Sequence, residues 1–84
     1  MTFPTLKENQ FAVVMADGYT GIVLNVDNTI YENNTAANIY FVFEDIESAK
    51  EFIKNYGSLH EKNEFIIYNH KQEMVGFTKS RIWK

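Results

Sequence analysis

The chain has 84 residues, a formal net charge of −3, and no cysteine, which excludes disulfides, thiol nucleophiles and thiolate metal sites. A chain of this length forms one domain, so we expect residues 1–84 to be a single domain with residues 1–10 as an N-terminal arm. No apolar run approaches the length that spans a bilayer, and the first residues lack a signal-peptide pattern. We therefore expect a cytoplasmic protein that does not bind membranes.

The charge is unevenly spread along the chain. Residues 1–47 hold one lysine and seven carboxylates, a net charge of −6, whereas residues 48–84 hold seven basic and four acidic groups, a net charge of +3. An acidic surface attracts basic partners and repels nucleic acid. The N-terminal half therefore favours a basic protein as the partner, whereas the alternative is an ordinary solvated surface.

The first predicted element is a hairpin. Residues 11–16 (FAVVMA) and 22–26 (IVLNV) read as strands, and Asp17-Gly18-Tyr19-Thr20-Gly21 between them is rich in residues typical of turns. The GxxG within this turn resembles a phosphate-binding loop only in its spacing, since such a loop in KH domains joins two helices. The segment is thus predicted to be a β-turn without a ligand.

Residues 27–38 form a polar, Asn-rich segment that we predict to be a loop. Asn25, Asp27, Thr29 and Glu32 alternate like part of a calcium loop, but a central glycine and a twelfth-position glutamate are missing. No calcium site is predicted here.

A strand followed by a helix is the clearest feature of the chain. Residues 39–43 (IYFVF) are continuously apolar, which predicts a strand that is covered on both faces or central in its sheet. Apolar residues then recur at steps of three and four, which places them on one side of a helix: Ile46, Ala49, Phe52, Ile53 and Tyr56. We predict Asp45 as the N-cap and Gly57 as the residue that ends the helix.

The last third of the chain is predicted to be a polar connection over residues 58–64, a strand over 65–69, a turn over 70–73 and a strand over 74–78. His60 begins a sequence, HEKNE, that resembles the zinc-protease motif but lacks its second histidine. Ser48, Ser58 and Ser80 lie in no recognisable nucleophile turn. Arg81 and Trp83 are residue types that often anchor interfaces, although Trp83 also fits an edge strand that packs back on the sheet.

These elements predict a two-layer α+β fold, in which a single helix packs on a curved, mainly antiparallel sheet of about five strands in the order β-β-β-α-β-β. One helix covers one face of such a sheet. We expect the other face to be partly open, to carry aromatic residues and to offer a surface for a partner or a homodimer.

The run NIYFVFEDIESAKEFIKNYG resembles the third strand and second helix of an RNA-recognition motif. The similarity covers about a quarter of the chain, and it departs from the family in its aromatic spacing, in the absent first helix and in the acidic N-terminal half. It is a likeness of one local unit. It implies single-stranded nucleic acid stacked on Tyr40, Phe41 and Phe43 as an alternative function.

The first functional hypothesis is a small non-catalytic protein-binding module, an inhibitor or immunity-type protein that occludes a basic toxin or enzyme. The candidate partner-binding residues are Asp17, Asp27, Glu32, Glu44, Asp45, Glu47 and Trp83. The sequence predicts no catalytic residue, metal or cofactor. Besides the nucleic-acid module, two alternatives remain: a structural subunit of a larger assembly, and a site formed in an oligomer around His60 or His70.

Overall fold

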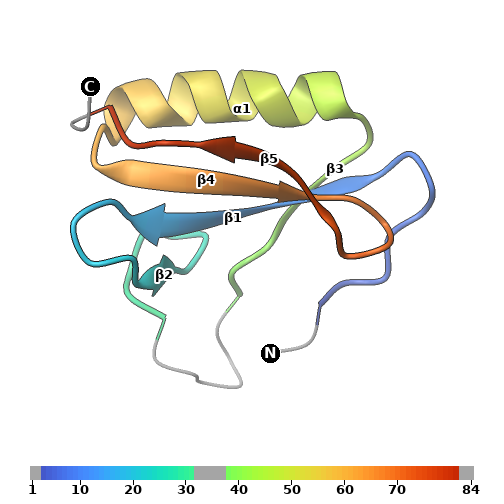
Figure 1. The fold of residues 1–84 in the computed structure, drawn as a ribbon, viewed down its shortest axis with the longest axis horizontal. Coiled ribbons are helices and arrows are strands. Elements are labelled where there is room, and N and C mark those ends of the chain that lie inside the picture. The colour runs from blue at the N-terminus through green and yellow to red at the C-terminus, as the bar shows by residue number, and fades with distance from the viewer. Residues whose placement is uncertain (1–2, 32–37, 82–84) are drawn as a thin grey trace.

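The computed structural model describes residues 3–31 and 38–81 of the chain. The elements follow the order β1 (Phe11–Asp17), β2 (Val23–Leu24), β3 (Phe41–Phe43), α1 (Ile46–Leu59), β4 (Asn63–Tyr68) and β5 (Met74–Thr78). Figure 1 shows α1 lying along one side of a twisted sheet, with β5, β4 and β1 running below it. The predicted α+β architecture with one helix and five antiparallel strands is confirmed, and the sheet is not closed into a barrel.

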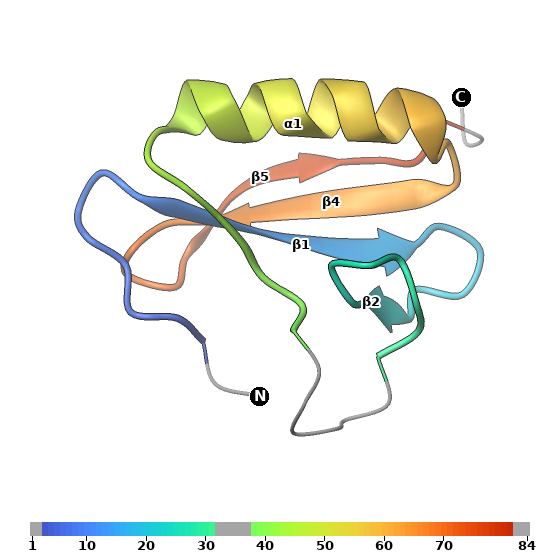
Figure 2. The same ribbon diagram turned by 180° about the vertical axis from the view of Figure 1, so that it is seen from behind.

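The sheet is built around β1 and β4. Strand β4 pairs with β1 from Ala12↔Tyr68 to Asp17↔Asn63, and β5 pairs with the other side of β4. On its remaining side β1 pairs with β3 near its start and with β2 near its end. Figure 2 shows this edge from behind, with the segment that contains β3 crossing β1 on its way to the helix. Within the described residues, β5 therefore forms one edge of the sheet, and β2 with β3 forms the other.

The core lies between α1 and the sheet. Alternate residues of β1 and β4 point toward the helix, and they pack with α1 in a cluster of buried residues: Val13, Met15, Leu24, Ala49, Ile53, Phe65 and Ile67. The predicted apolar face of α1 is confirmed. Asp45 caps the helix as predicted, because its Oδ1 accepts a hydrogen bond from Ser48 N at 2.7 Å.

Two details of this region differ from the sequence-based expectation. Gly57 does not end the helix, which continues to Leu59 with His60 as C-cap. Gly57 is buried, and a Cβ there would lie 3.4 Å from the Phe65 ring and 3.7 Å from the Arg81 guanidinium. The missing side chain thus lets other elements approach α1 closely, and it is not needed for a left-handed turn.

The sequence allowed two arrangements for the apolar run 39–43, and one of them, a strand in the centre of the sheet, is wrong. Only Phe41–Phe43 form a strand, at the sheet edge beside β1. The run is continuously apolar because its residues pack on both sides: Phe41 and Phe43 against the helix, and Tyr40 against Phe3 on the far side. Periodicity alone does not distinguish these two arrangements.

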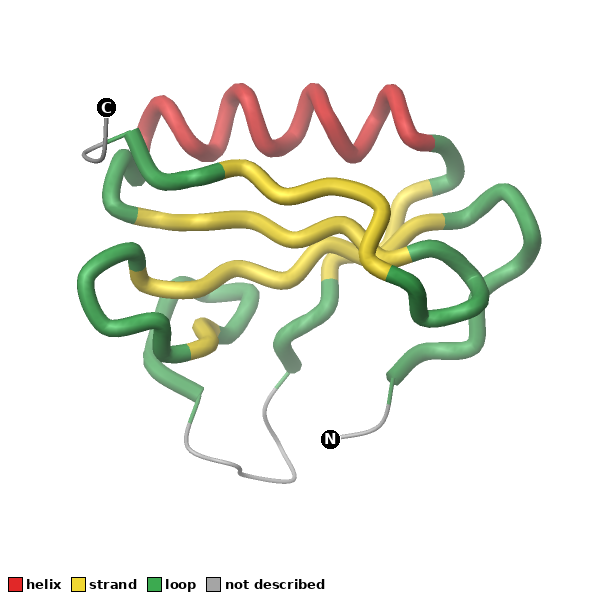
Figure 3. Tube along the Cα trace, in the orientation of Figure 1, coloured by secondary structure: helices red, strands yellow, loops and turns green. Residues whose placement is uncertain are grey.

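The sheet face away from α1 is covered where β4 ends and is open at β5, where Phe77 is exposed. Phe3, in the N-terminal arm, packs edge-on against Tyr40 and Tyr68 at centroid distances of 5.2 and 5.8 Å. Desolvation by this packing raises the pKa of Tyr40 above its usual value. Figure 3 shows the arm as a green loop beside the sheet and β5 as the yellow strand nearest the red helix, with no further strand beyond it.

Candidate binding groove

The predicted acidic residues lie at two ends of the molecule. Asp17 is the last residue of β1. Glu44 lies near the first residue of β1, because it follows Phe43, which pairs with Phe11. Seven residues in an extended strand span about 20 Å at roughly 3.3 Å per residue. Glu32 and Trp83 lie outside the described residues. The five candidate carboxylates within the described residues therefore form two groups. Asp17 and Asp27 lie in one, because Asn28 bonds to Asn63, the partner of Asp17, and Glu44, Asp45 and Glu47 lie in the other.

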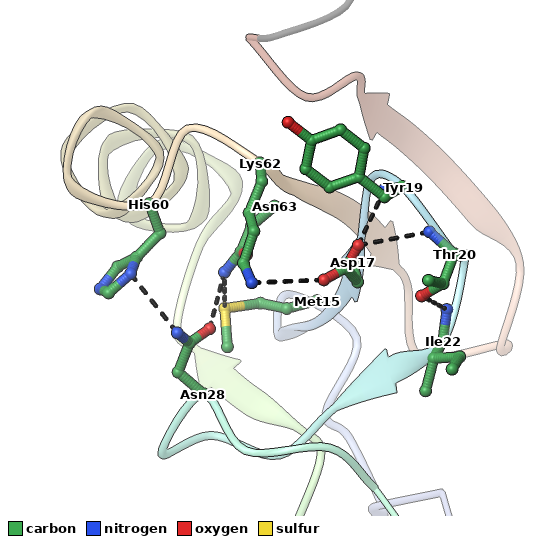
Figure 4. Close-up of polar contacts among 9 residues, drawn as sticks. All are labelled: Met15, Asp17, Tyr19, Thr20, Ile22, Asn28, His60, Lys62 and Asn63. Atoms are coloured by element: carbon green, nitrogen blue, oxygen red, sulfur yellow. Dashed lines mark hydrogen bonds and ion pairs between the residues drawn. The ribbon is translucent and has the colours of Figure 1, made fainter.

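Asp17 organises the turn that follows β1 (Figure 4). Its Oδ1 accepts hydrogen bonds from Tyr19 N at 2.8 Å and Thr20 N at 3.3 Å, and its Oδ2 lies 3.4 Å from Lys62 Nζ. These contacts stabilise the charged form, the bond from Tyr19 N most of all, and hold the pKa of Asp17 below its usual value. In the same turn Gly18 N donates to the Lys62 carbonyl oxygen at 2.6 Å, an approach that leaves no room for a Cβ at this position.

Asp27 has a similar local role in the loop after β2. Its Oδ1 accepts hydrogen bonds from the Thr29 hydroxyl at 2.5 Å and from Thr29 N at 3.1 Å. The hydroxyl bond is the main reason that the pKa of Asp27 lies below its usual value. Glu44 and Asp45 are also engaged, since Glu44 Oε2 accepts a bond from Gln10 Nε2 at 2.6 Å and Asp45 caps α1.

A polar cluster at the C-terminal end of α1 joins three segments (Figure 4). Asn63 Nδ2 donates to Asn28 Oδ1 at 2.9 Å and approaches Met15 Sδ at 3.6 Å, and Asn28 Nδ2 lies 3.4 Å from His60 Nδ1. Asn28 adopts a left-handed conformation with φ of 71°. Asn63 is only 2 % exposed, and its Oδ1 has no hydrogen-bond partner within the described residues. The cluster fixes the loop after β2 against the start of β4.

The two histidines do not form a joint site. His60 caps α1 and stacks on Tyr56 at a centroid distance of 4.5 Å, whereas His70 follows the opposite end of β4. In the part of the chain that the structure describes, no group of three or more His, Asp or Glu side chains is placed to hold a metal ion. No helix within that part has the length and apolar character required to cross a bilayer.

The aromatic residues predicted to stack on nucleic acid do not share a face. Phe41 and Phe43 lie under the helix, with ring centroids 4.5 and 5.2 Å from Phe52, and Tyr40 packs on the opposite side against Phe3. Base stacking needs free aromatic faces along one surface. The arrangement implied by the RNA-recognition resemblance is therefore absent from this strand.

A groove of about 430 Å³ lies between α1 and β5, where the sequence had suggested no site. Its floor includes Ile53, Phe65 and Ile67 from the core, and its β5 side includes Gly76 and Thr78. Four cations also line it, namely Lys50, Lys54, Lys79 and Arg81, whereas none of its described lining residues is acidic. The groove thus joins an apolar floor to a basic rim.

Arg81 closes one end of this groove. Its Nη2 donates to the Lys54 carbonyl oxygen at 3.0 Å, and its backbone N donates to Glu61 O at 2.8 Å. The last turn of α1 itself has no basic residue, so Arg81 brings a cation to the negative end of the helix dipole. The positive charge of residues 48–84 was visible in the sequence. Its concentration on one groove was not, because Lys50 and Lys79 lie far apart in the chain.

Comparison with known proteins gives no relative from which a role could be transferred. No protein-family model matches the chain. No curated protein and no solved structure resembles it at a significant level either. The functional conclusion consequently depends on the geometry described above.

Proposed function

We propose that this protein is a non-catalytic protein-binding module that recognises its partner through the edge strand β5. The observation that carries this proposal is the apolar exposure of the strand. Met74, Val75 and Phe77 are 62, 49 and 55 % exposed, and Met74–Thr78 contains no charged residue.

An edge strand of this kind is unusual in a protein that acts alone. The outer backbone N–H and C=O groups of an edge strand are free to pair with another chain, and natural edges are commonly protected by charges or prolines. β5 has neither within its length, although the pairing with β4 shifts register between Ile67 and Tyr68. Exposed apolar side chains beside unpaired backbone favour recognition by strand addition.

The experiment compares partner capture by variants of the tagged protein in native lysate. Val75→Lys with Phe77→Lys places charges on β5, and Ile22→Lys with Leu59→Lys is the matched control at exposed apolar positions elsewhere. We expect a stoichiometric partner protein to be retained by the wild type and the control and lost by the β5 variant. Equal retention by all three proteins, with circular dichroism unchanged, would contradict the proposal.

A second candidate is the acidic inhibitor that the sequence suggested. Glu44, Asp45 and Glu47 are exposed together at the start of α1, which favours a basic partner at that end of the molecule. Its test is Glu44→Lys with Glu47→Lys, which spares the N-cap. Loss of the partner in this variant, with retention in the β5 variant, would select the inhibitor over the β5 module.

A further inference from the structure

We infer that the groove between α1 and β5 binds an acidic peptide in extended conformation, which pairs with the free edge of β5 and directs its carboxylates to the basic rim. This inference rests on the proposed function and names the chemistry of the partner. The groove, the charges and the strand edge each support one part of it.

The shape of the groove follows from the sheet register. Gly76 pairs with Ile67 and Thr78 pairs with Phe65, and both partners point into the core beneath α1. Gly76 and Thr78 therefore face the same side, where one has no side chain and the other a short one. The Ile67 side chain packs over Gly76, where a Cβ would lie 3.1 Å from Ile67 Cδ1, and the groove lies above Ile67 and Phe65. That space suits the aliphatic side chains of an added strand, not the bulk of a folded domain.

The three lysines of the rim have no ion-pair partner among the residues that the structure describes. Lys50 and Lys54 lie one helical turn apart on the side of α1 toward β5, and Lys79 directly follows the strand. Within residues 3–31 and 38–81 the ion pair present is Lys62–Asp17, so none of these three lysines is neutralised. Cations gathered around an apolar floor complement a ligand that combines carboxylates with aliphatic groups.

The strand edge favours a peptide over nucleic acid as the anionic ligand. Backbone N–H and C=O groups along β5 are matched by another extended polypeptide. Phe65, the aromatic residue of the floor, is 1 % exposed and offers no face on which a base could stack. Phe77 also lines the groove, but it pairs with Ile66, so its ring lies on the sheet face away from α1. The same basic rim disfavours a second copy of this groove, because like charges placed opposite one another repel.

The test uses a short fluorescein-labelled peptide in which glutamates alternate with valines, measured by fluorescence anisotropy with the full chain. We expect saturable binding that weakens as salt is raised. Lys50→Glu with Lys54→Glu should weaken it about tenfold or more, since each reversal replaces an attraction with a repulsion. Lys7→Glu with Lys71→Glu makes the same charge change away from the groove, and should alter binding less than about twofold.

Two further measurements separate the groove from general electrostatics. A peptide with lysines in place of the glutamates should not bind. Backbone amide shifts of Gly76, Thr78 and Lys79 should change on titration with the acidic peptide. Equal weakening by both charge-reversal pairs, displacement of the peptide by a single-stranded oligonucleotide, or absence of binding at low salt would overturn the inference.

The native partner distinguishes failure of this inference from failure of the proposed function. If β5 substitutions release the partner and the Lys50→Glu with Lys54→Glu variant retains it, β5 binds proteins but the groove does not take their acidic residues. If both variants retain the partner, the proposed function itself is wrong. Dimers of the wild type in sedimentation that disappear on β5 substitution would replace the peptide with a second copy.

Discussion

The two sides of α1 differ in how they meet the sheet. Toward β3, Phe52 packs against Phe41 and Phe43, and its ring also approaches Tyr56 at 5.2 Å and Phe65 at 6.3 Å. Toward β5, the helix presents Lys50, Ile53, Lys54 and Gly57 across a groove from Gly76 and Thr78. The same helix thus forms a filled aromatic layer on one side and an open basic cleft on the other.

The difference shows how side-chain size across a sheet decides where a single helix leaves space. Large aromatic residues on β3 reach α1 and fill the gap, whereas small residues on β5 do not. Because interiors pack densely wherever side chains allow it, an open groove marks positions where the sequence supplies too little volume. Because such a groove is open to solvent, cations without an ion-pair partner can stay hydrated at its rim. In a filled interface the same unpaired charges would be buried at a high cost in free energy.

The largest expected effect comes from removing an aromatic side chain between α1 and β3. Phe52→Ala removes the ring that contacts four other aromatic residues, and we expect it to lower the free energy of unfolding by about 3 kcal/mol. Urea denaturation measures the change. Thr78→Ala is the control on the open side of α1 and should cost less than about 1 kcal/mol, because Thr78 faces the groove and is exposed. Equal losses would show that the two sides are packed alike.

A smaller effect of opposite sign is expected from filling the groove. Thr78→Leu places additional apolar atoms beside Phe65, and burial of each further carbon contributes about 0.8 kcal/mol at most, so we expect stabilisation by about 1 kcal/mol. The same variant should bind the acidic peptide at least about tenfold more weakly, since it occupies the peptide's space. Thr5→Leu, at an exposed position of the arm, should change neither quantity. Destabilisation by Thr78→Leu would mean that no usable space exists beside β5.

The smallest expected effect concerns pH and the acidic groups away from the groove. Hydrogen bonds lower the pKa of Asp17, Asp27 and Asp45 in the folded protein, chiefly those from Tyr19 N, the Thr29 hydroxyl and Ser48 N. The unfolded chain therefore binds protons more readily, so this stabilisation is present above the ordinary aspartate pKa of about 4 and is lost as pH falls below it. We expect the Tm to be level near neutral pH and to fall below about pH 4.

Asp45→Asn sharpens this last prediction. Asparagine keeps the N-cap hydrogen bond but does not titrate, so the Tm of this variant should fall less steeply in acid than that of the wild type. Glu51→Gln removes one negative charge from an exposed position of α1 and serves as the control. An acid transition identical in wild type and Asp45→Asn would show that the N-cap carboxylate contributes nothing to it.

Much of the fold was predictable because it depends on local patterns. The spacing of apolar residues identified the buried face of α1, and Asp45 marked its first turn. The end of the helix could not be predicted in the same way, because Gly57 is required for close packing with Phe65 and not for a turn. The acidic candidate residues were identified by composition, but composition does not reveal that β1 separates them by its whole length.

The sequence by itself determined the element order, the antiparallel α+β class and the amphipathic face of α1, because each follows from backbone geometry acting over a few residues. The tertiary structure alone decided that β5 lies at the sheet edge and that Lys50, Lys54, Lys79 and Arg81 line one groove. Strand order and register bring those distant residues together, and they are set by packing of the whole core, which no short stretch of sequence encodes.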